Sequence, residues 1–307
     1  MSNLKKLALP SAVALLMAVS VPAWQAGAPQ KAAAKKTVAR SPQCPQVTPE
    51  QAAEQLQLQV RYKDEILNAS KLLQKDPAGY HLWQTPMGKW WIPQGDDWML
   101  PFNLAEQKRL IYGTGPRAVK AGDIVLDCGA NVGVYTRLAL DAGAKKVIAI
   151  EPAPENIEAL RRNFKDDIAA GRVVVYPKGV WDKDDILTLK VDPNNTAADT
   201  FVMDIKTGEK GVKVPLTTID KLTAELKLER VDYIKMDIEG AEQRALTGGQ
   251  ATLRKYHPRL ALSAYHVPDD PAKIPALVRK AWPGYKMECG PCAEAEGKLR
   301  PDVLYFR

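Results

Sequence analysis

The sequence predicts an α/β fold in which helices cover both faces of a doubly wound, mostly parallel sheet. From residue 123 onward, strand-like apolar runs alternate with helix-like segments, as in a series of strand–helix–strand units. The apolar run 124–126 ends in a carboxylate, Asp127, and a glycine-bearing turn then opens onto a helix. The next apolar run, 147–150, also ends in an acid, Glu151. A unit of this kind predicts a nucleotide site at the carboxyl ends of the strands.

The segments ahead of the sheet predict a helix and a region rich in tryptophan. Thr48-Pro49-Glu50-Gln51 supplies a capping residue and a proline at the first helical position, so we expect a helix from Pro49 to Lys75. Residues 80–105 carry four tryptophans among prolines and glycines. This favours short strands and turns that pack against a neighbour, or a lid over a substrate pocket. With a helix expected at 102–112, residues 49–115 form a subdomain ahead of the main domain at 116–307.

In the main domain, the apolar runs and the turn residues between them set the expected elements. An additional strand is expected at 186–191, and the segments 285–288 and 303–306 are expected to form an antiparallel edge pair. The strands of the parallel sheet are expected at 123–127, 147–151, 172–176, 231–236 and 259–265, with helices at about 133–143, 154–166, 218–227 and 239–255.

The turn after the first strand predicts the kind of nucleotide. Its glycines let the backbone approach a ligand closely, with the amides of the helix start facing it. The turn reads G-A-N-V-G and lacks the third glycine of the G-x-G-x-x-G turn, which disfavours a dehydrogenase. Asp127 can meet an ammonium directly or through water, and Glu151 can accept hydrogen bonds from ribose hydroxyls. We therefore predict an S-adenosylmethionine site in which Gly129, Asn131 and Gly133 cradle the methionine end.

Four motifs occur over roughly residues 100 to 307 in the order found in a known family. They are the run from Gly122 to Gly133, Glu151-Pro152 with Asn156 after it, Thr218-Ile219-Asp220, and Asp232 to Glu242, which contains K-M-D-I-E-G-A-E. By these motifs the chain resembles the FkbM-type S-adenosylmethionine-dependent methyltransferases, and the last motif is much more specific than the glycine turn. The resemblance implies a Rossmann-like class I methyltransferase fold. It also implies adenine contacts from Gly179 and Val180 and a further cofactor contact from Asn156.

Candidate catalytic residues follow the fourth and fifth strands. Methyl transfer from a sulfonium is an in-line displacement, so the protein must align the acceptor and remove the proton of a hydroxyl acceptor. Lys235, Asp237 and Glu239 alternate along an extended backbone and are expected to project from one face. His266 ends the fifth strand, facing the same cleft. We predict Asp237 and His266 as candidate bases, Glu239 as the orienting group and Lys235 as a source of positive charge.

Each of these residues has an ordinary alternative role. Asp237 or Glu239 could cap the helix that begins near Gly240, because anions are favoured at helix N-termini. His266 could be a surface histidine with satisfied hydrogen bonds. Two carboxylates and an imidazole are plausible ligands for a divalent metal, but the sequence does not require one and no metal is predicted.

The N-terminal residues bear on the compartment and on the class of partner. Residues 1–23 combine Lys5 and Lys6 with an apolar run and a Val-Pro-Ala site, which predicts a signal peptide or, if uncleaved, a membrane anchor. Residues 24–48 predict a flexible linker. Six of the seven excess positive charges lie in residues 1–40, so the remainder is nearly neutral and a nucleic-acid partner is not indicated. Export is therefore expected, with membrane anchoring or, if the start site is misassigned, a cytoplasmic location as alternatives.

The cysteines predict a structural disulfide between Cys289 and Cys292, across a Gly-Pro turn, with redox activity as the alternative. Cys44 has no evident partner and is interpreted as free. Cys128, inside the turn after the first strand, is interpreted as an inert buried thiol.

The acceptor is expected to be a small molecule with a hydroxyl, a sugar or a polyketide-like natural product, as the resemblance suggests. S-adenosylmethionine is made inside cells, whereas the leader indicates export. The alternatives are retention inside, action outside on supplied cofactor, or a secreted binding module that kept the fold and lost the transfer reaction. The oligomeric state is not indicated by the sequence.

Overall fold

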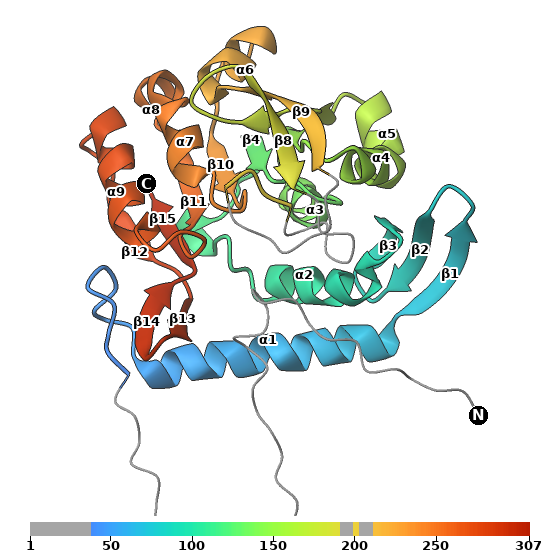
Figure 1. The fold of residues 1–307 in the computed structure, drawn as a ribbon, viewed down its shortest axis with the longest axis horizontal. Helices are drawn as coiled ribbons and strands as arrows, with labels where there is room; N and C mark the ends of the chain where they lie inside the picture. The colour runs from blue at the N-terminus through green and yellow to red at the C-terminus, as the bar shows by residue number, and fades with distance from the viewer. Residues whose placement is uncertain (1–37, 191–198, 203–210) are drawn as a thin grey trace, which may run out of the picture.

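The computed structural model describes residues 38–190, 199–202 and 211–307 of the chain. At its centre is a seven-stranded sheet with the order β12-β15-β11-β10-β4-β5-β6 (Figure 1). Strands β4, β5, β6, β10 and β11 are parallel, and β15 pairs antiparallel with both β11 and β12. The strands are β4 (Ile124–Cys128), β5 (Lys146–Ile150), β6 (Val173–Tyr176), β10 (Tyr233–Met236), β11 (Arg259–Ser263), β12 (Met287–Cys289) and β15 (Val303–Phe306). The predicted α/β fold and its antiparallel edge pair are confirmed.

Helices cover both faces of this sheet, because side chains alternate across each strand and both faces are apolar. Leu126 and Ile234 point to the face covered by α6, α7, α8 and α9. Val125 and Tyr233 point to the opposite face, which packs against α3, with α4 beside it. The helices are α3 (Val134–Asp141), α4 (Pro154–Asn163), α5 (Lys165–Ala169), α6 (Ile219–Glu225), α7 (Glu242–Thr247), α8 (Gln250–Tyr256) and α9 (Asp270–Ala281).

The order of the strands fixes where a ligand can bind. The chain starts at β4, proceeds outward through β5 and β6, and then returns to β10 on the other side of β4. The crossovers therefore leave β4 in opposite directions. Such a switch point opens a crevice at the carboxyl ends of the two strands, here β4 and β10. Residues 129–133 and 237–242 follow these two strand ends.

The helix predicted at Pro49–Lys75 is shorter in the structure. α1 (Pro49–Ala69) begins as expected, with a reciprocal cap between Thr48 and Gln51. Most of the last predicted turn instead belongs to β1 (Lys71–Asp76), which pairs with β2 (Tyr80–Thr85). Pairing with a neighbouring strand overrides the local helical pattern, so the prediction was wrong over this segment.

The tryptophan-rich region contributes two strands to a three-stranded antiparallel sheet. The short strands and turns predicted for this region are therefore present. The sheet consists of β1, β2 and β3 (Gly88–Pro93), and α2 (Met99–Lys108) follows it. The side chain of Asn163 joins this sheet to the main domain by bonding the backbone of Trp91 in both directions, at 2.7 and 2.9 Å. The same amide donates to the carbonyl of Val132 at 2.9 Å. This sheet, on the right of Figure 1, therefore contacts α4, whose last residue also bonds the turn after β4.

Two long helices of the prediction are interrupted. The segment 239–255 forms α7 and α8, separated at Gly248 and Gly249, and the carboxylate of Asp220 accepts hydrogen bonds from Ala251 N and Thr252 N at the start of α8. The segment 154–166 likewise divides into α4 and α5. In the first case a side chain from another element satisfies the amides of a new helix start, which a local pattern does not indicate.

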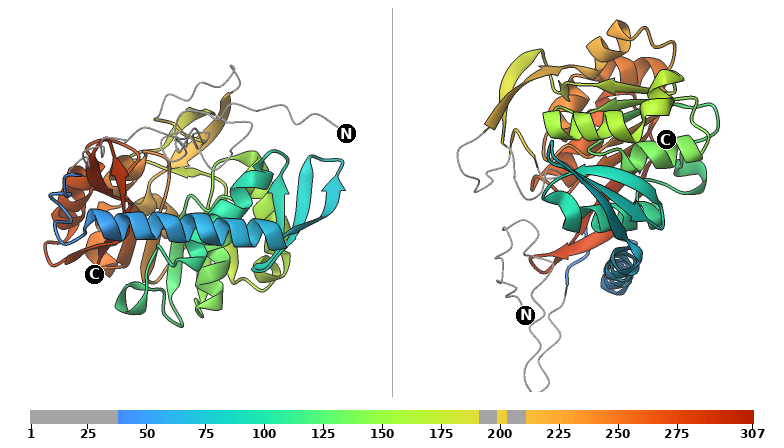
Figure 2. Two further views of the ribbon diagram at one scale, coloured as in Figure 1. Left: turned by 90° about the horizontal axis from the view of Figure 1, so that it is seen from below. Right: turned by 90° about the vertical axis from the view of Figure 1, so that its right-hand side faces the viewer.

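Smaller elements complete the described structure. The expected strand at 186–191 is present as β8 (Asp185–Lys190), in a sheet with β7 (Gly179–Val180) and β9 (Gly211–Thr217). A hairpin of β13 (Cys292–Ala295) and β14 (Lys298–Pro301) lies beside α1 (Figure 2). Short 3₁₀ turns, Asp96–Trp98 and Gly115–Arg117, precede α2 and β4.

The cysteine pairing differs from the prediction. Cys44 forms a disulfide with Cys289, whereas Cys292 and Cys128 are free and buried. The predicted Cys289–Cys292 link and the free Cys44 are therefore wrong, because the segment before α1 folds back onto the end of β12, 245 residues away in sequence.

The N-terminal predictions are resolved only in part. Within the described end of the predicted linker, Ser41 and Cys44 are buried, and the Cys44 disulfide attaches this segment to β12. Residues 1–37, with the predicted signal peptide and the rest of the predicted linker, lie outside the described residues. Among the residues that the structure describes, no helix is long and apolar enough to cross a membrane.

Candidate functional site

The turn after β4 is built for close approach of backbone. Gly129 has a φ of +76°, and a Cβ at this position would lie 1.8 Å from the carbonyl oxygen of Asp237. Gly129 N and Ala130 N both donate to the carbonyl of Ile150, at 3.0 and 3.1 Å. Gly133, with a φ of +95°, is the residue from which α3 starts. The turn is thus held tightly between the ends of β5 and β10.

Glu151 connects the end of β5 to this turn. Its carboxylate accepts hydrogen bonds from Asn131 N and Ala153 N, both at 2.9 Å. The side chain of Asn156 also bonds it. Burial raises the pKa of Glu151 to about 7, although these hydrogen bonds oppose the shift. The structure therefore brings together Glu151, Asn131 and Asn156, three of the predicted cofactor-binding residues.

Asp127 is fully buried and pairs with two side chains rather than facing solvent. Thr136 donates its hydroxyl to Asp127 Oδ2 at 2.7 Å, and Lys235 Nζ lies 3.4 Å from Asp127 Oδ1. Lys235 also donates to the carbonyl of Gly129 at 2.7 Å. Burial alone would lower the pKa of Lys235, but Asp127 and Asp237 outweigh it and raise that pKa above its usual value. Lys235 thus places its charge against the glycine turn.

Gly179 and Val180 form β7, near the same end of the sheet. The backbone N–H of Glu151 donates to the carbonyl of Tyr176, shortly before β7 in the chain, at 3.2 Å. Both residues of β7 are buried, and Val180 packs in the core with Tyr176. Their contact with adenine remains a prediction.

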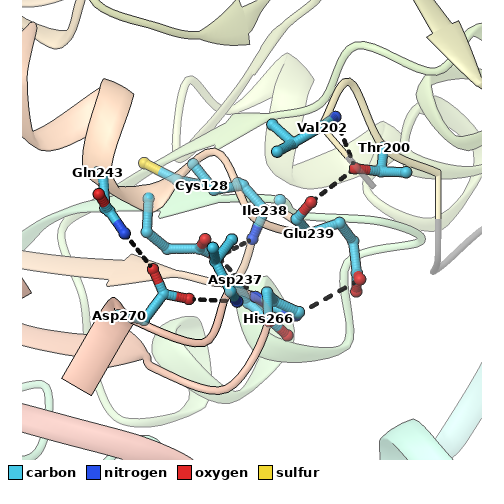
Figure 3. Close-up of polar contacts among 12 residues, drawn as sticks. Cys128, Thr200, Val202, Asp237, Ile238, Glu239, Gln243, His266 and Asp270 are labelled. Atoms are coloured by element: carbon cyan, nitrogen blue, oxygen red, sulfur yellow. Dashed lines mark hydrogen bonds and ion pairs between the residues drawn. The ribbon is translucent and has the colours of Figure 1, made fainter. Parts of the chain in front are cut away.

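Three of the four predicted catalytic residues, Asp237, Glu239 and His266, lie together, whereas Lys235 pairs with Asp127. His266 Nε2 lies 3.5 Å from Asp237 Oδ1 and 3.4 Å from Glu239 Oε2 (Figure 3). Glu239 has a φ of +52°, which turns the chain so that its side chain and that of Asp237 approach the same ring. The hydroxyl of Thr200 holds this turn by donating to the carbonyl of Glu239 at 2.6 Å.

One further acid completes the carboxylate–histidine cluster, which comprises Asp237, Glu239, Glu242 and His266. Glu242 is completely buried, and its Oε1 lies 2.9 Å from His266 Nδ1 while accepting from Ile238 N. Glu242 belongs to the K-M-D-I-E-G-A-E motif, so the sequence held a signal for it.

A tyrosine from outside the motifs also reaches the cluster. Tyr112 donates its hydroxyl to Asp237 Oδ2 at 2.7 Å. The two residues are 125 positions apart in the chain, and no local pattern indicated their contact.

Neighbouring charges shift the pKa values of His266 and Asp237 in opposite directions. Burial alone would lower the pKa of His266, but Glu239 and Glu242 outweigh it and raise that pKa well above its usual range. Burial favours the neutral form of Asp237, yet Lys235 and His266 together lower its pKa. Asp237 is therefore an anion at neutral pH. It lies one residue beyond β10, with its backbone N–H donating to the carbonyl of Cys128 at the end of β4.

Comparison with known proteins identifies related methyltransferases. A family model described as the methyltransferase FkbM domain matches residues 127–285, slightly more than half of the chain. The 31-O-demethyl-FK506 methyltransferase FkbM of Streptomyces tacrolimicus is 28% identical, over 42% of this chain and 60% of that protein. Methyltransferase sdnD of Sordaria araneosa is 29% identical, over 40% of this chain and 59% of that protein. The chain thus spans about three fifths of the length of these relatives.

Among solved structures, the chain is similar to the methyltransferase FkbM from Methylobacillus flagellatus KT. The sequence identity is 18% and the TM-score is 0.47, over 83% of this chain and 60% of that one. The matched region of the family model begins at Asp127 and contains the glycine turn, Glu151 and the carboxylate–histidine cluster. Because this model matches more than half of the chain, the protein belongs to the FkbM methyltransferase family.

Proposed function

We propose that the protein transfers a methyl group from S-adenosylmethionine to a hydroxyl of a small molecule, a sugar or a natural product of polyketide-like chemistry. The observation that carries this proposal is the contact between the two halves of the site. Gly129, in the turn after β4, lies directly against the backbone of Asp237, which begins the carboxylate–histidine cluster. A methyl donor held by the turn would therefore meet an acceptor held by the cluster.

The cofactor half of the site supports S-adenosylmethionine through its shape and charge. Glu151, at the end of β5 with Asn156 beside it, is the residue proposed to accept hydrogen bonds from ribose hydroxyls. Gly129, Asn131 and Gly133 offer backbone to the methionine end, next to the buried pair of Asp127 and Lys235.

The acceptor half supplies the groups that an O-methyltransferase needs. Methyl transfer requires that the acceptor oxygen lose its proton and attack in line with the carbon–sulfur bond. Asp237 and His266 are the groups proposed to receive that proton, and Glu239 is proposed to orient the hydroxyl. The methyl group leaves the sulfonium as a new carbon–oxygen bond forms, and the electron pair of the broken bond stays on sulfur.

Calorimetric titration of the purified protein with S-adenosylmethionine, and separately with NAD, tests the cofactor. Micromolar binding of S-adenosylmethionine alone is the expected result, and failure to bind S-adenosylmethionine would refute the proposal. For the hydroxyl, sugars and their deoxy analogues are compared as acceptors by the release of S-adenosylhomocysteine. Equal release with the deoxy analogue would exclude the replaced hydroxyl as the methylated group.

Export of the protein is also proposed, and the Cys44–Cys289 disulfide supports it, because disulfides persist mainly in oxidising compartments. Fractionation of cells after alkylation of free thiols tests this proposal. Recovery of the oxidised protein outside the cytoplasm is expected. A reduced protein found only in the cytoplasm would contradict it.

A further inference from the structure

The carboxylate–histidine cluster has donor atoms without ordinary hydrogen-bond partners. His266 Nε2, Asp237 Oδ1 and Glu242 Oε2 are all buried and make no hydrogen bond of normal geometry within the described structure. The side chain of His266 is only 2% exposed. Its Nε2 lies close to the carboxylates of both Asp237 and Glu239 (Figure 3). Buried polar atoms without a hydrogen-bond partner require an explanation, and a bound ion is one that suits a histidine surrounded by carboxylates.

Glu242 determines which nitrogen of His266 is free. Its Oε1 lies 2.9 Å from Nδ1, so Nδ1 donates to it, and Nε2 is the nitrogen that offers a lone pair to an ion once it has lost its proton to solvent. Histidines that bind metal ions usually have their other ring nitrogen held in this way by a carboxylate or carbonyl. Glu242 is itself fixed by the backbone N–H of Ile238. The ring is therefore oriented before any ligand arrives.

We propose that His266 Nε2, Asp237 and Glu239 bind a divalent metal ion, with Glu242 holding the imidazole in position. The potential ligand atoms of Asp237, Glu242 and His266 lie within 4.8 Å of one another, and Glu239 adds a third carboxylate 3.4 Å from His266 Nε2. The distances of 3.4 and 3.5 Å from Nε2 to the two carboxylates suit a common ion at about 2.0–2.2 Å from each atom. One imidazole nitrogen with two carboxylate oxygens suits Mn²⁺, Fe²⁺ or Zn²⁺.

An acceptor would reach the cluster from the side of its carboxylates. The side chains of Asp237 and Glu239 are 21% and 19% exposed, whereas that of His266 is 2% exposed. This inference rests on the proposed function, because an acceptor hydroxyl that coordinates the ion would lose its proton more easily. The proton would pass to solvent, and His266 would then act as a ligand rather than as the base.

The test measures metal binding directly. The full chain, freed of metal with EDTA and then of EDTA by dialysis, is titrated by calorimetry with MnCl₂ and, separately, with ZnCl₂. One ion per chain is expected for at least one of them. Glu242→Gln and Glu239→Gln should lower the affinity about 10–100-fold, the usual effect of changes around a metal ligand.

Asp97→Asn is the matched control, because Asp97 also pairs with a buried histidine, His81, at 2.8 Å but lies outside the cluster. Its metal affinity should equal that of the unmutated chain. Circular dichroism establishes that each variant is folded, and the unmutated chain tests the proposal without any variant. Absence of binding for both ions, or equal binding by folded Glu239→Gln, would overturn it.

The outcome is separable from that of the cofactor experiment. S-adenosylmethionine is titrated into the same metal-free chain, because neither the turn after β4 nor Glu151 supplies a proposed ligand of the ion. Cofactor binding without metal binding would refute only the metal site and would leave a protonated His266 paired with the carboxylates. Loss of cofactor binding would instead refute the proposed function.

Discussion

The burial of Glu151 predicts that binding of S-adenosylmethionine depends on pH. Glu151 is buried, and its pKa is raised to about 7. A protonated carboxyl is a poorer acceptor for ribose hydroxyls, so the affinity for S-adenosylmethionine should fall as the pH falls through 7. If only the ionised form binds, the affinity at pH 6 should be about tenfold lower than at pH 8. Calorimetry at the two pH values measures this difference.

The pH dependence of stability has the opposite sign to that of cofactor affinity: the contribution of Glu151 to the free energy of unfolding rises as the pH falls. Because the folded state raises the pKa of Glu151, the cost of burying its charge is fully present above pH 7 and is relieved as the pH falls toward 4.5. Glu151→Gln is the control for cofactor binding. It should weaken binding at pH 8 by about 1–3 kcal/mol and remove the step between the two pH values. A step of equal size in this variant would assign the titration to the ligand or to another residue.

Replacing Gly129 should cause a steric clash, and a second glycine, Gly171, allows its effect to be separated from that of the backbone conformation. A left-handed backbone conformation costs an alanine roughly 1 kcal/mol. Gly129→Ala should lower the free energy of unfolding by several times this amount, because the new Cβ would also collide with the carbonyl of Asp237. Gly171 has a similar φ of +69° and open space around it. Gly171→Ala should therefore show the backbone cost alone. Urea unfolding measures both, and equal losses would mean that the ends of β4 and β10 can separate.

At the scale of elements, Asn163 at the end of α4 ties the tryptophan-rich sheet to the glycine turn. Asn163→Ala removes three hydrogen bonds, to Trp91 N, Trp91 O and Val132 O. It should lower the free energy of unfolding by about 2–3 kcal/mol, near 1 kcal/mol for each bond. The affinity for S-adenosylmethionine should fall as well, because Val132 belongs to the turn.

The control for this variant is Arg161→Ala, an exposed change on the same helix. It should leave both the unfolding free energy and cofactor affinity nearly unchanged. Normal cofactor affinity in a destabilised Asn163→Ala protein would show that the sheet supports the fold without shaping the turn.

Elements whose signals are local could be predicted from the sequence, and those that depend on distant partners could not. The apolar runs around Val125, Ile148 and Ile234 are buried on both faces, so their hydrophobic pattern alone predicted parallel strands. Residues 71–75 look helical in isolation, yet they pair with β2.

In the candidate site, too, some residues could be predicted from a local pattern and others could not. The side chains that follow β10 and β11 converge because the carboxyl ends of neighbouring parallel strands meet at one edge of the sheet, and this rule needs only the strand pattern. Tyr112 reaches Asp237 from a segment before the sheet, and no local signal could place it there.

At the scale of the whole molecule, the Cys44–Cys289 disulfide closes the chain from the segment before α1 to the last strands. The segment that contains Cys44 lies at the left of Figure 1, near the hairpin of β13 and β14. A crosslink over 245 residues restricts the unfolded chain strongly. Its sequence signal was weak, because C-x-x-C spacing favours a pairing within the motif, while Cys44 stands in a segment with few large apolar residues.

Cys44→Ser should lower the free energy of unfolding by about 2–4 kcal/mol, the range typical of a native disulfide. Urea unfolding of the unmutated protein with and without a reductant provides the matched comparison. The reductant should destabilise the unmutated protein by a similar amount and leave Cys44→Ser unaffected. Peptide mapping without reduction identifies the linked cysteines. A peptide that joins Cys289 to Cys292 would contradict the observed pairing, and the segment before α1 would then have no covalent link to the main domain's last strands.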